Sequence, residues 1–216
     1  MGVLDLLLPP ACAGCGRYGD LLCRRCVGAL QAAGSGADRF ALADAGLVVG
    51  EQFVLARAAF AHRGPARRAL QRLKYGGAGR LALPLARVAL PTFLELIEIS
   101  GPATLVPVPV HAERLRQRGY NQAALLAREL GAGAGLQVRE ILERRRATTR
   151  QHGLNRTARL ANLRGAFGLR EDSPVPDRAI LVDDILTTSA TLEACAAVLR
   201  DAGCTEVFGF AVAREV

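Results

Sequence analysis

The chain has 216 residues, half of them hydrophobic, which suits one main domain with a small appendage. No stretch reaches the roughly 18 consecutive apolar residues of a membrane span, so we expect none. The first residues lack the basic start and the apolar run of about 7–15 residues that mark a secretory signal. This predicts a cytoplasmic protein whose cysteines are reduced or metal-bound.

Positive charge is concentrated in one part of the chain. The formal net charge is +8, and all but one of the 28 basic residues are arginine, Lys74 being the exception. Residues 111–170 contain thirteen arginines and four glutamates, a local net charge of +9. Such a local excess favours an anionic ligand, either a polyphosphate or a nucleic acid.

The chain divides into a cysteine-bearing module at 1–30, a linker with short strands at 31–60, and a main domain at 61–216. In the main domain, segments with helical spacing of apolar residues alternate with short apolar runs. This predicts an α/β fold, a mostly parallel sheet flanked by helices. The expected strands are a short pair within 48–61 and single strands at 105–110, 137–142, 179–182 and 207–213. The expected helices are 65–75, 81–97 (bent or broken near its two prolines), 121–130 (with Asn121 as N-cap) and 189–202.

Two long loops are expected between these elements. One follows the strand at 105–110 and contains Arg114, Arg116 and Arg118. The other covers residues 144–162, which are polar and basic with little periodicity, and leads into a helix.

Two Cys-x-x-Cys pairs stand near the N-terminus, separated by seven residues. Each pair can direct two thiolates at one ion, and two pairs complete a tetrahedral site, most often for zinc. Redox-active thiols and disulfides are the alternatives. Four ligands leave no open position, so we expect structural zinc that supplies much of the folding energy of the module. Gly16 suits the tight turn of the first pair. The ligands are Cys12, Cys15, Cys23 and Cys26.

A second candidate site lies where the strand at 179–182 runs into a helix. Asp183 and Asp184 stand at the carboxyl end of that strand, where open α/β sheets bind ligands. The first turn of the helix offers free backbone N–H groups and the positive end of the helix dipole, which suit a phosphate monoester. The residues expected to bind the phosphate are Thr187, Thr188, Ser189, Ala190 and Thr191.

The two acids have a different role from the turn. Carboxylates repel phosphate, but they accept hydrogen bonds from hydroxyl groups, and a furanose diol supplies two. The pattern therefore predicts a site for a phosphorylated ribose. The alternative is that Thr188 or Ser189 merely caps a helix, but a cap does not require two costly acids beside a sheet core.

The segment Ile180-Leu-Val-Asp-Asp-Ile-Leu-Thr-Thr-Ser-Ala-Thr-Leu192 is similar to the signature of type I phosphoribosyltransferases. More of the chain resembles one branch of that group, the ComF family of competence-associated proteins. That family usually has glycine where this chain has Ser189. The supporting landmarks are the cysteine pairs, Leu73-Lys-Tyr-Gly76, Val106-Pro-Val-Pro109, Arg118-Gly-Tyr-Asn-Gln122 and residues 149–167.

The resemblance implies a type I phosphoribosyltransferase-like fold, with phosphoribosyl pyrophosphate as ligand and Mg²⁺ on its pyrophosphate. It also implies that Arg114 and Arg118 receive the pyrophosphate, while Asp183 and Asp184 hold the ribose during catalysis. The loop that begins at 144 would close over the substrate. For any single arginine, an ordinary solvated basic face is an equal alternative.

Three functions stay open at this stage. The first is a phosphoribosyltransferase with an unknown acceptor. The second, implied by the family name, is an accessory protein of DNA uptake, with single-stranded DNA and a DNA-uptake helicase as partners. The third is a regulator that senses phosphoribosyl pyrophosphate without turning it over. Aromatic residues make up only 5% of the chain, so stacking platforms for single strands are few.

Overall fold

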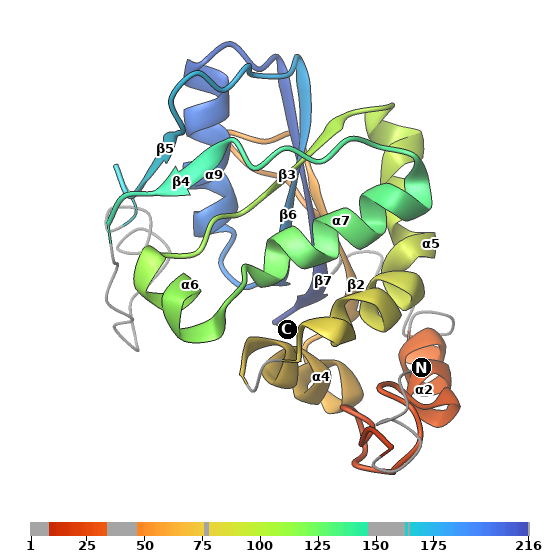
Figure 1. Ribbon diagram of the computed structural model, residues 1–216. Helices are drawn as coiled ribbons and strands as arrows, with labels where there is room; N and C mark the ends of the chain where they lie inside the picture. Colours follow the sequence, from red (N-terminus) through yellow and green to blue (C-terminus); the bar gives the residue numbers. More distant parts are fainter. Residues whose placement is uncertain (1–8, 34–46, 76–77, 147–162, 164, 216) are drawn as a thin grey trace.

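The computed structural model describes residues 9–33, 47–75, 78–146, 163 and 165–215. It has the predicted class, α/β with a mostly parallel sheet flanked by helices (Figure 1). Only the first strand of the sheet is antiparallel to its neighbour. In sheet order the strands are β1 (Leu47–Val48), β2 (Ala56–Ala61), β7 (Glu206–Arg214), β6 (Arg178–Leu186) and β3 (Thr104–Pro107).

Helices cover both faces of this sheet, because its central strands are apolar on both sides. Helices α5 (Ala82–Ser100) and α7 (Gln122–Ala134) pack on one face, and α9 (Ala190–Asp201) covers the other (Figure 1). The side chains of β6 divide accordingly. Ile180 and Val182 belong to the core cluster on the α5–α7 side, and Leu181 belongs to the cluster on the α9 side.

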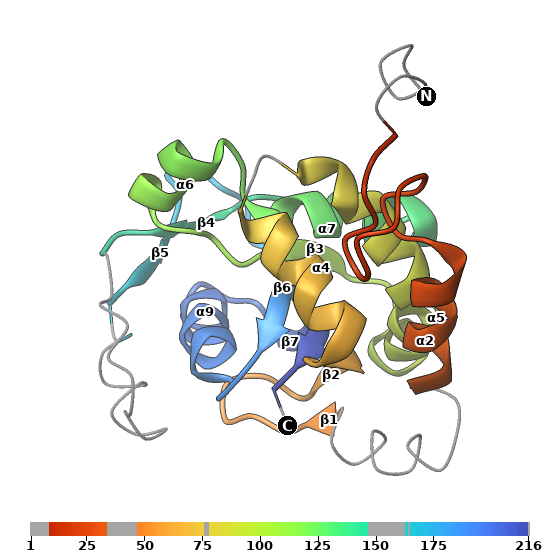
Figure 2. The same ribbon diagram turned by 90° about the horizontal axis from the view of Figure 1, so that it is seen from below.

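Helix α4 (Gly64–Lys74) lies across the carboxyl edge of the sheet, and Figure 2 looks onto that edge. Pro65 occupies its first turn, as predicted. Helix α2 (Arg24–Ala33) of the cysteine module packs beside α4, and a short 3-10 turn, η1 (Gly79–Leu81), precedes α5. The module shares one apolar core with the sheet and α4, since Leu22 and Leu30 cluster with Leu70 and Leu73.

Several predicted elements are confirmed. The pair of strands within 48–61, the strands at 105–110 and 207–213, and the helices at 65–75, 121–130 and 189–202 are present within a few residues of their predicted ends. Asn121 is the N-cap of α7, where its side-chain oxygen accepts a hydrogen bond from the Ala123 amide at 3.1 Å. Of the loop predicted at 144–162, residues 147–162 lie outside the described residues.

The helix predicted at 81–97, bent or broken near its two prolines, is present and is not broken. Helix α5 continues from Ala82 to Ser100 with Pro91 inside it. Pro84 lies in the first turn, where a missing N–H costs nothing. Pro91 removes one hydrogen bond, but Phe93 and Leu96 beyond it are fully buried and hold the helix against the core.

The loop predicted after β3 is also wrong in part, because the arginines lie on a short helix, α6 (Ala112–Arg118). His111 caps its start by accepting a hydrogen bond from the Glu113 amide at 3.4 Å, and Gly119 ends it with a φ of +81°. His111 and Gly119 could have been recognised as cap residues from the sequence. The many arginines between them, however, leave no helical spacing of apolar residues.

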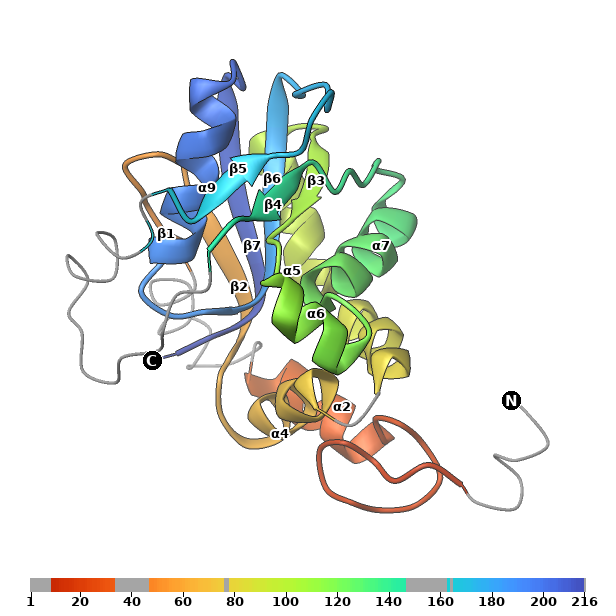
Figure 3. The same cartoon turned by 60° about the vertical axis from the view of Figure 1, so that its left-hand side comes forward.

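The strand predicted at 137–142 begins later. Val138 makes only an isolated parallel bridge with Leu105. The regular strand is β4 (Leu142–Arg144), paired antiparallel with β5 (Phe167–Leu169), and β5 packs against α9 (Figure 3). Among the described residues, no helix has the length and apolar character needed to cross a membrane.

Candidate functional site

The carboxyl ends of β3 and β6 are the point where ligands are expected in this sheet. The chain leaves β3 toward α6 and α7, whereas it leaves β6 toward α9 on the opposite face (Figure 2). Open α/β sheets bind ligands outside two adjacent strands whose connections depart in opposite directions.

Strand β6 is longer than predicted, so Asp183 and Asp184 lie inside it and not after it. Pairing with β3 stops at Pro107 and Val182, whereas pairing with β7 continues to Leu186. The two acids therefore occupy a stretch of β6 that has lost its neighbour on one side. That open edge explains how a strand can carry two acids next to the core.

The two acids have different neighbours, although their carboxyl groups are close enough to interact with each other. Asp184 points toward α4, where its Oδ2 lies 2.7 Å from Nζ of Lys74 in an ion pair whose side chains are 10% and 15% exposed. Asp183 lies on the α9 side, within electrostatic reach of Cys195 and Arg144.

Asp183 has an unusual protonation behaviour. Burial, and then the negative charge of Asp184, raise the pKa of Asp183 well above its ordinary value of about 3.8. Its Oδ1 accepts a hydrogen bond from the Asp184 amide at 2.7 Å, which occupies a backbone donor in the stretch of β6 beyond β3. Acids with strongly raised pKa values are typical of functional sites.

The turn between β6 and α9 holds one strained residue. Ser189 has a φ of +56° and a ψ of −4°, the left-handed region that non-glycine residues seldom adopt. Its hydroxyl donates to the Thr188 carbonyl at 2.6 Å, and its side chain caps no amide of α9. The simple cap by Ser189 that the sequence left open is therefore not formed. Phosphate binding by residues 187–191 remains a prediction.

Glu193, in the first turn of α9, was not expected from the sequence to have a role. Its side chain is buried, and its two carboxylate oxygens accept hydrogen bonds from the amides of Glu51 and Gln52 at 3.0 and 2.9 Å. These bonds fix the start of α9 to the segment before β2. Through these bonds, the turn that is predicted to bind phosphate is attached to the segment that leads into the sheet.

The arginines of α6 face two different neighbours. Arg114 lies near the guanidinium of Arg144, whose pKa is lowered by burial first and then by the charge of Arg114. Arg118 lies over the Tyr75 ring, 5.3 Å from its centroid. Of the two predicted pyrophosphate contacts, Arg114 therefore lies near Arg144, while Arg118 packs at the end of α4.

Two further residues at this edge were missed by the sequence analysis. Lys74 pairs with Asp184, and its visible signals were that it is the only lysine and that it lies in the landmark Leu73-Lys-Tyr-Gly76, to which the sequence analysis gave no role in the site. His62 follows β2 with a 12% exposed side chain, and its Nδ1 lies 3.8 Å from an oxygen of Glu215. Burial lowers the pKa of His62 below its ordinary value of 6.5. No sequence pattern marked His62.

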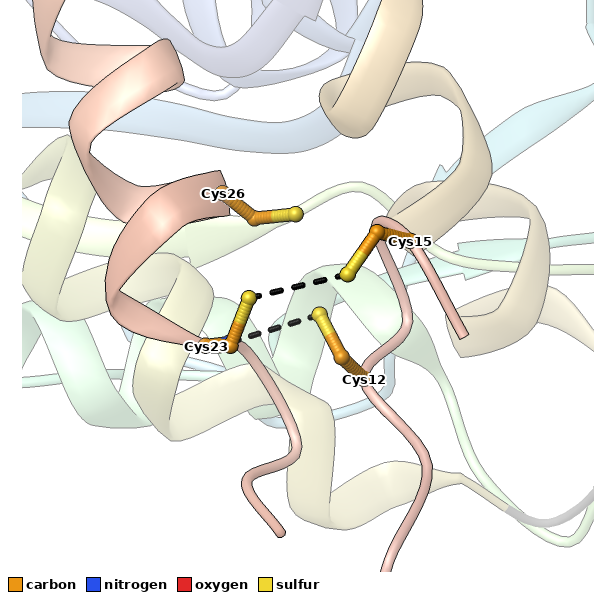
Figure 4. Close-up of side chains that lie close together, drawn as sticks. All are labelled: Cys12, Cys15, Cys23 and Cys26. Atoms are coloured by element: carbon orange, nitrogen blue, oxygen red, sulfur yellow. Dashed lines mark hydrogen bonds between the residues drawn. The ribbon is translucent and has the colours of Figure 1, made fainter. Parts of the chain in front are cut away.

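The four cysteines of the N-terminal module form one cluster, with sulfurs that all lie within 4.8 Å of one another (Figure 4). The sulfurs of Cys15 and Cys23 are 3.6 Å apart. Zinc with bonds of about 2.3 Å would place tetrahedral sulfurs about 3.8 Å apart, so the cluster can hold a structural metal such as zinc. Burial opposes ionisation of Cys12, but backbone hydrogen bonds from Cys23, Cys15 and Gly14 lower its pKa to about 6.

Two glycines shape the first cysteine pair. Gly16 has a φ of +81°, and its amide donates to the Cys12 carbonyl at 2.8 Å, which confirms its predicted turn role. Gly14 is needed for a different reason, because a Cβ there would lie 2.6 Å from the Cys26 sulfur.

Helix α4 connects the cysteine module to the acids. Arg72 donates to the carbonyls of Ala11 and Cys12 at 3.3 and 3.2 Å, and Arg68 donates to the Gly14 carbonyl. At its other end α4 carries Lys74. A cleft of about 650 Å³ lies between the module and α4. Its lining residues are Ala13, Gly14, Cys15, Gly16, Arg68, Gln71, Arg72 and Tyr75.

Fold and site together define an α/β protein with a mostly parallel, helix-flanked sheet and a four-cysteine cluster able to hold a metal. Its acids lie where such sheets bind ligands. No family model matches the chain.

Among curated proteins, the chain is similar to competence and DNA-utilization proteins. It is 35% identical to Competence protein F of Haemophilus influenzae over 54% of this chain and 52% of that protein. It is 34% identical to the DNA utilization protein YhgH of Escherichia coli over 64% and 62%. It is 32% identical to Competence protein ComFC of Streptococcus pneumoniae over 50% and 47%. The chain therefore spans about half to three fifths of the length of these relatives.

Proposed function

We propose that this protein binds phosphoribosyl pyrophosphate, or a related 5-phosphoribosyl compound, and acts as a phosphoribosyltransferase with a role in DNA uptake. The main support is Asp183, an acid of raised pKa at the open edge of β6, the strand that leads into the turn before α9. The names of the relatives support the link to competence and DNA utilization.

In the proposed reaction, the bond between the anomeric carbon and pyrophosphate breaks, and a bond to the acceptor nucleophile forms. Residues 187–191 would hold the 5-phosphate through backbone amides and hydroxyls. The carboxylates of Asp183 and Asp184 would hold the diol and stabilise positive charge that develops on the sugar. Arg114 would contact the pyrophosphate, and Mg²⁺ would arrive with that ligand.

Calorimetric titration with phosphoribosyl pyrophosphate and Mg²⁺ tests the binding step. Saturable heat is expected from the wild type, and its loss from a variant with both Asp183→Asn and Asp184→Asn. Asp201→Asn removes one carboxylate at the far end of α9 and should bind normally. Absence of heat from the wild type at millimolar ligand would reject the proposal. Binding without pyrophosphate release in an acceptor screen would favour a sensor over a transferase.

A second candidate function, the handling of single-stranded DNA, is favoured by the cleft between the cysteine module and α4. Arg68 and Arg72 line the cleft, and the ring of Tyr75 is 64% exposed beneath the guanidinium of Arg118. Cationic side chains beside an exposed aromatic ring suit a nucleic-acid strand, because phosphates meet the charges while bases stack on the ring.

Fluorescence anisotropy with a labelled oligothymidine tests this second function. Tyr75→Ala should weaken binding about fivefold to 150-fold, equivalent to the roughly 1–3 kcal/mol of one stacked base. Tyr18→Ala, an equally exposed ring outside the cleft, should bind like the wild type. Affinity should also fall steeply with salt. Equal losses in the two variants would reject the cleft as the binding site.

A further inference from the structure

Lys74 is the only lysine of the chain, and it occupies a nearly buried position. All the other basic residues, 27 of the 28, are arginine. Its ammonium lies 2.7 Å from Oδ2 of Asp184, and both side chains are largely hidden from solvent. Lys74 is thus the only basic side chain that ends in an ammonium and not a guanidinium, and it forms the ion pair at the candidate site.

The two cationic groups act differently on a carboxylate. A guanidinium is a flat fork that engages both oxygens of a carboxylate, whereas an ammonium is a compact charge with three separate donors. The pair with Lys74 is made through Oδ2 of Asp184. An ammonium can therefore hold the carboxylate in place through one oxygen while the other oxygen stays outside that pair. The ammonium also keeps two more N–H donors for a second acceptor.

Hydrogen bonds at the end of α4 hold Lys74 in this position. It is the last residue of α4, and the carbonyl of the preceding residue, Leu73, accepts a hydrogen bond from the Tyr120 hydroxyl at 2.7 Å. The Tyr75 amide bonds back to Gln71 and Arg72, which closes the helix. The ammonium is therefore presented to Asp184 by an anchored helix end.

The charges around the pair decide which ligand it can accept. Asp183 and Asp184 would together repel a ligand that brings further negative charge. The positive charge of Lys74, which is paired with Asp184, offsets part of this repulsion. If Asp184 holds the hydroxyl on C2 of a ribose, the next carbon is the anomeric carbon, and we expect its substituent to face the ammonium.

We propose that Lys74 is the specificity-determining residue of this site, and that its ammonium selects a ribose with an anionic substituent beside the diol. This inference rests on the proposed function. It predicts that a pyrophosphate on the anomeric carbon is favoured over the neutral hydroxyl that ribose 5-phosphate carries there. Lys74 thereby provides the preference for phosphoribosyl pyrophosphate, separately from the turn that binds the 5-phosphate.

The test compares two ligands, phosphoribosyl pyrophosphate with Mg²⁺ and ribose 5-phosphate with Mg²⁺, on the wild type and on Lys74→Gln. The glutamine amide can still donate to Asp184, and a thermal melt will show whether the variant is folded. The ratio of the two dissociation constants should fall at least tenfold in the variant, with the affinity for ribose 5-phosphate little changed. Arg67→Gln removes the same charge from an exposed position of α4 and should leave the ratio unchanged.

A second measurement uses the wild type alone. Lys74 carries the only side-chain amine, so acylation of this residue can be followed by peptide mass spectrometry. Phosphoribosyl pyrophosphate should slow the acylation of Lys74 at least fivefold more than saturating ribose 5-phosphate does.

Two results would overturn the inference while leaving the proposed function in place. One is that both ligands lose affinity equally in Lys74→Gln, which indicates a structural role. The other is that both protect the amine equally. If neither ligand binds the wild type, the proposed function fails and the inference fails with it.

Discussion

Ser189 is one of two non-glycine residues with a positive φ in the part of the chain that the structure describes, the other being Asp172. A non-glycine residue in the left-handed region is strained by roughly 1–2 kcal/mol, and glycine is not. Ser189 adopts this conformation at the turn into α9, where the resembling family usually has glycine. The surrounding contacts, including those of Glu193, hold the turn in place despite the strain.

Ser189→Gly should therefore improve the proposed site. Without a Cβ, the turn is unstrained and its amides can approach a phosphate more closely. Phosphoribosyl pyrophosphate should bind about fivefold more tightly by calorimetry, equivalent to about 1 kcal/mol. Ser189→Ala keeps the Cβ and loses only the hydroxyl, so it should show no gain. An equal gain in both variants would mean that the hydroxyl, and not the backbone, limits binding.

Asp183 should make stability depend on pH. Its pKa is raised in the folded state, so the unfolded chain releases this proton at lower pH than the folded protein does. The contribution to stability is complete below the ordinary pKa of about 3.8 and is lost as pH rises through the folded value.

Asp183→Asn should consequently melt at a higher temperature than the wild type at pH 7–8, because the asparagine oxygen can still accept from the Asp184 amide. The advantage should shrink as pH falls toward 4. Differential scanning calorimetry across this range measures it. An advantage that stays constant with pH would contradict the raised pKa.

For single residues, the sequence predicted the acids, the hydroxyl-rich turn and the four thiols, because each stands in a short contiguous motif. It did not predict Lys74 or His62, which come to the acids from the ends of α4 and β2. Nor did it predict the open edge beside Asp183 and Asp184, because that depends on β6 continuing to Leu186 beside β7 after its pairing with β3 has ended.

At the scale of elements, α4 links the cysteine module to the sheet. Arg68 and Arg72 attach it to the turn of the first cysteine pair, and Lys74 attaches it to β6. The same helix therefore contacts both the cysteine module and the candidate ligand site. Helix-cap and spacing rules predicted α4 and α7 well, since their ends carry Pro65 and Asn121. They did not predict α6, because its charged residues leave no apolar face.

The geometry of the cysteine turn gives a prediction of its own. Gly14→Ala places a Cβ 2.6 Å from the Cys26 sulfur, so the sulfurs cannot keep their positions. Zinc content should fall well below one per chain, and stability should fall by about 1–3 kcal/mol, the usual effect of overpacking. Metal analysis and thermal melts measure both quantities.

Gly28→Ala is the matched control for that experiment. A Cβ at position 28 of α2 meets no atom within 4 Å, and alanine is favoured in helices by about 0.5–1 kcal/mol. This variant should keep its zinc and its stability. If Gly14→Ala also kept full zinc, the four thiols would not form the proposed metal site.

For the whole molecule, alternation of strands and helices was enough to predict the α/β class and its mostly parallel sheet. The order of strands was not predictable in the same way, because β3 and β6 become neighbours only through pairing over more than 70 residues of chain. That pairing creates the open edge at Asp183 and Asp184. The site therefore depends on a long-range contact that no local motif encodes.

The central claim, that the turn into α9 receives a phosphate, is tested most directly by amide chemical shifts in a backbone-assigned NMR titration with phosphoribosyl pyrophosphate and Mg²⁺. The largest and saturable shifts should fall on the amides of residues 187–192, since these donors would meet the phosphate. Saturable shifts that leave these amides unchanged and appear elsewhere would contradict the account.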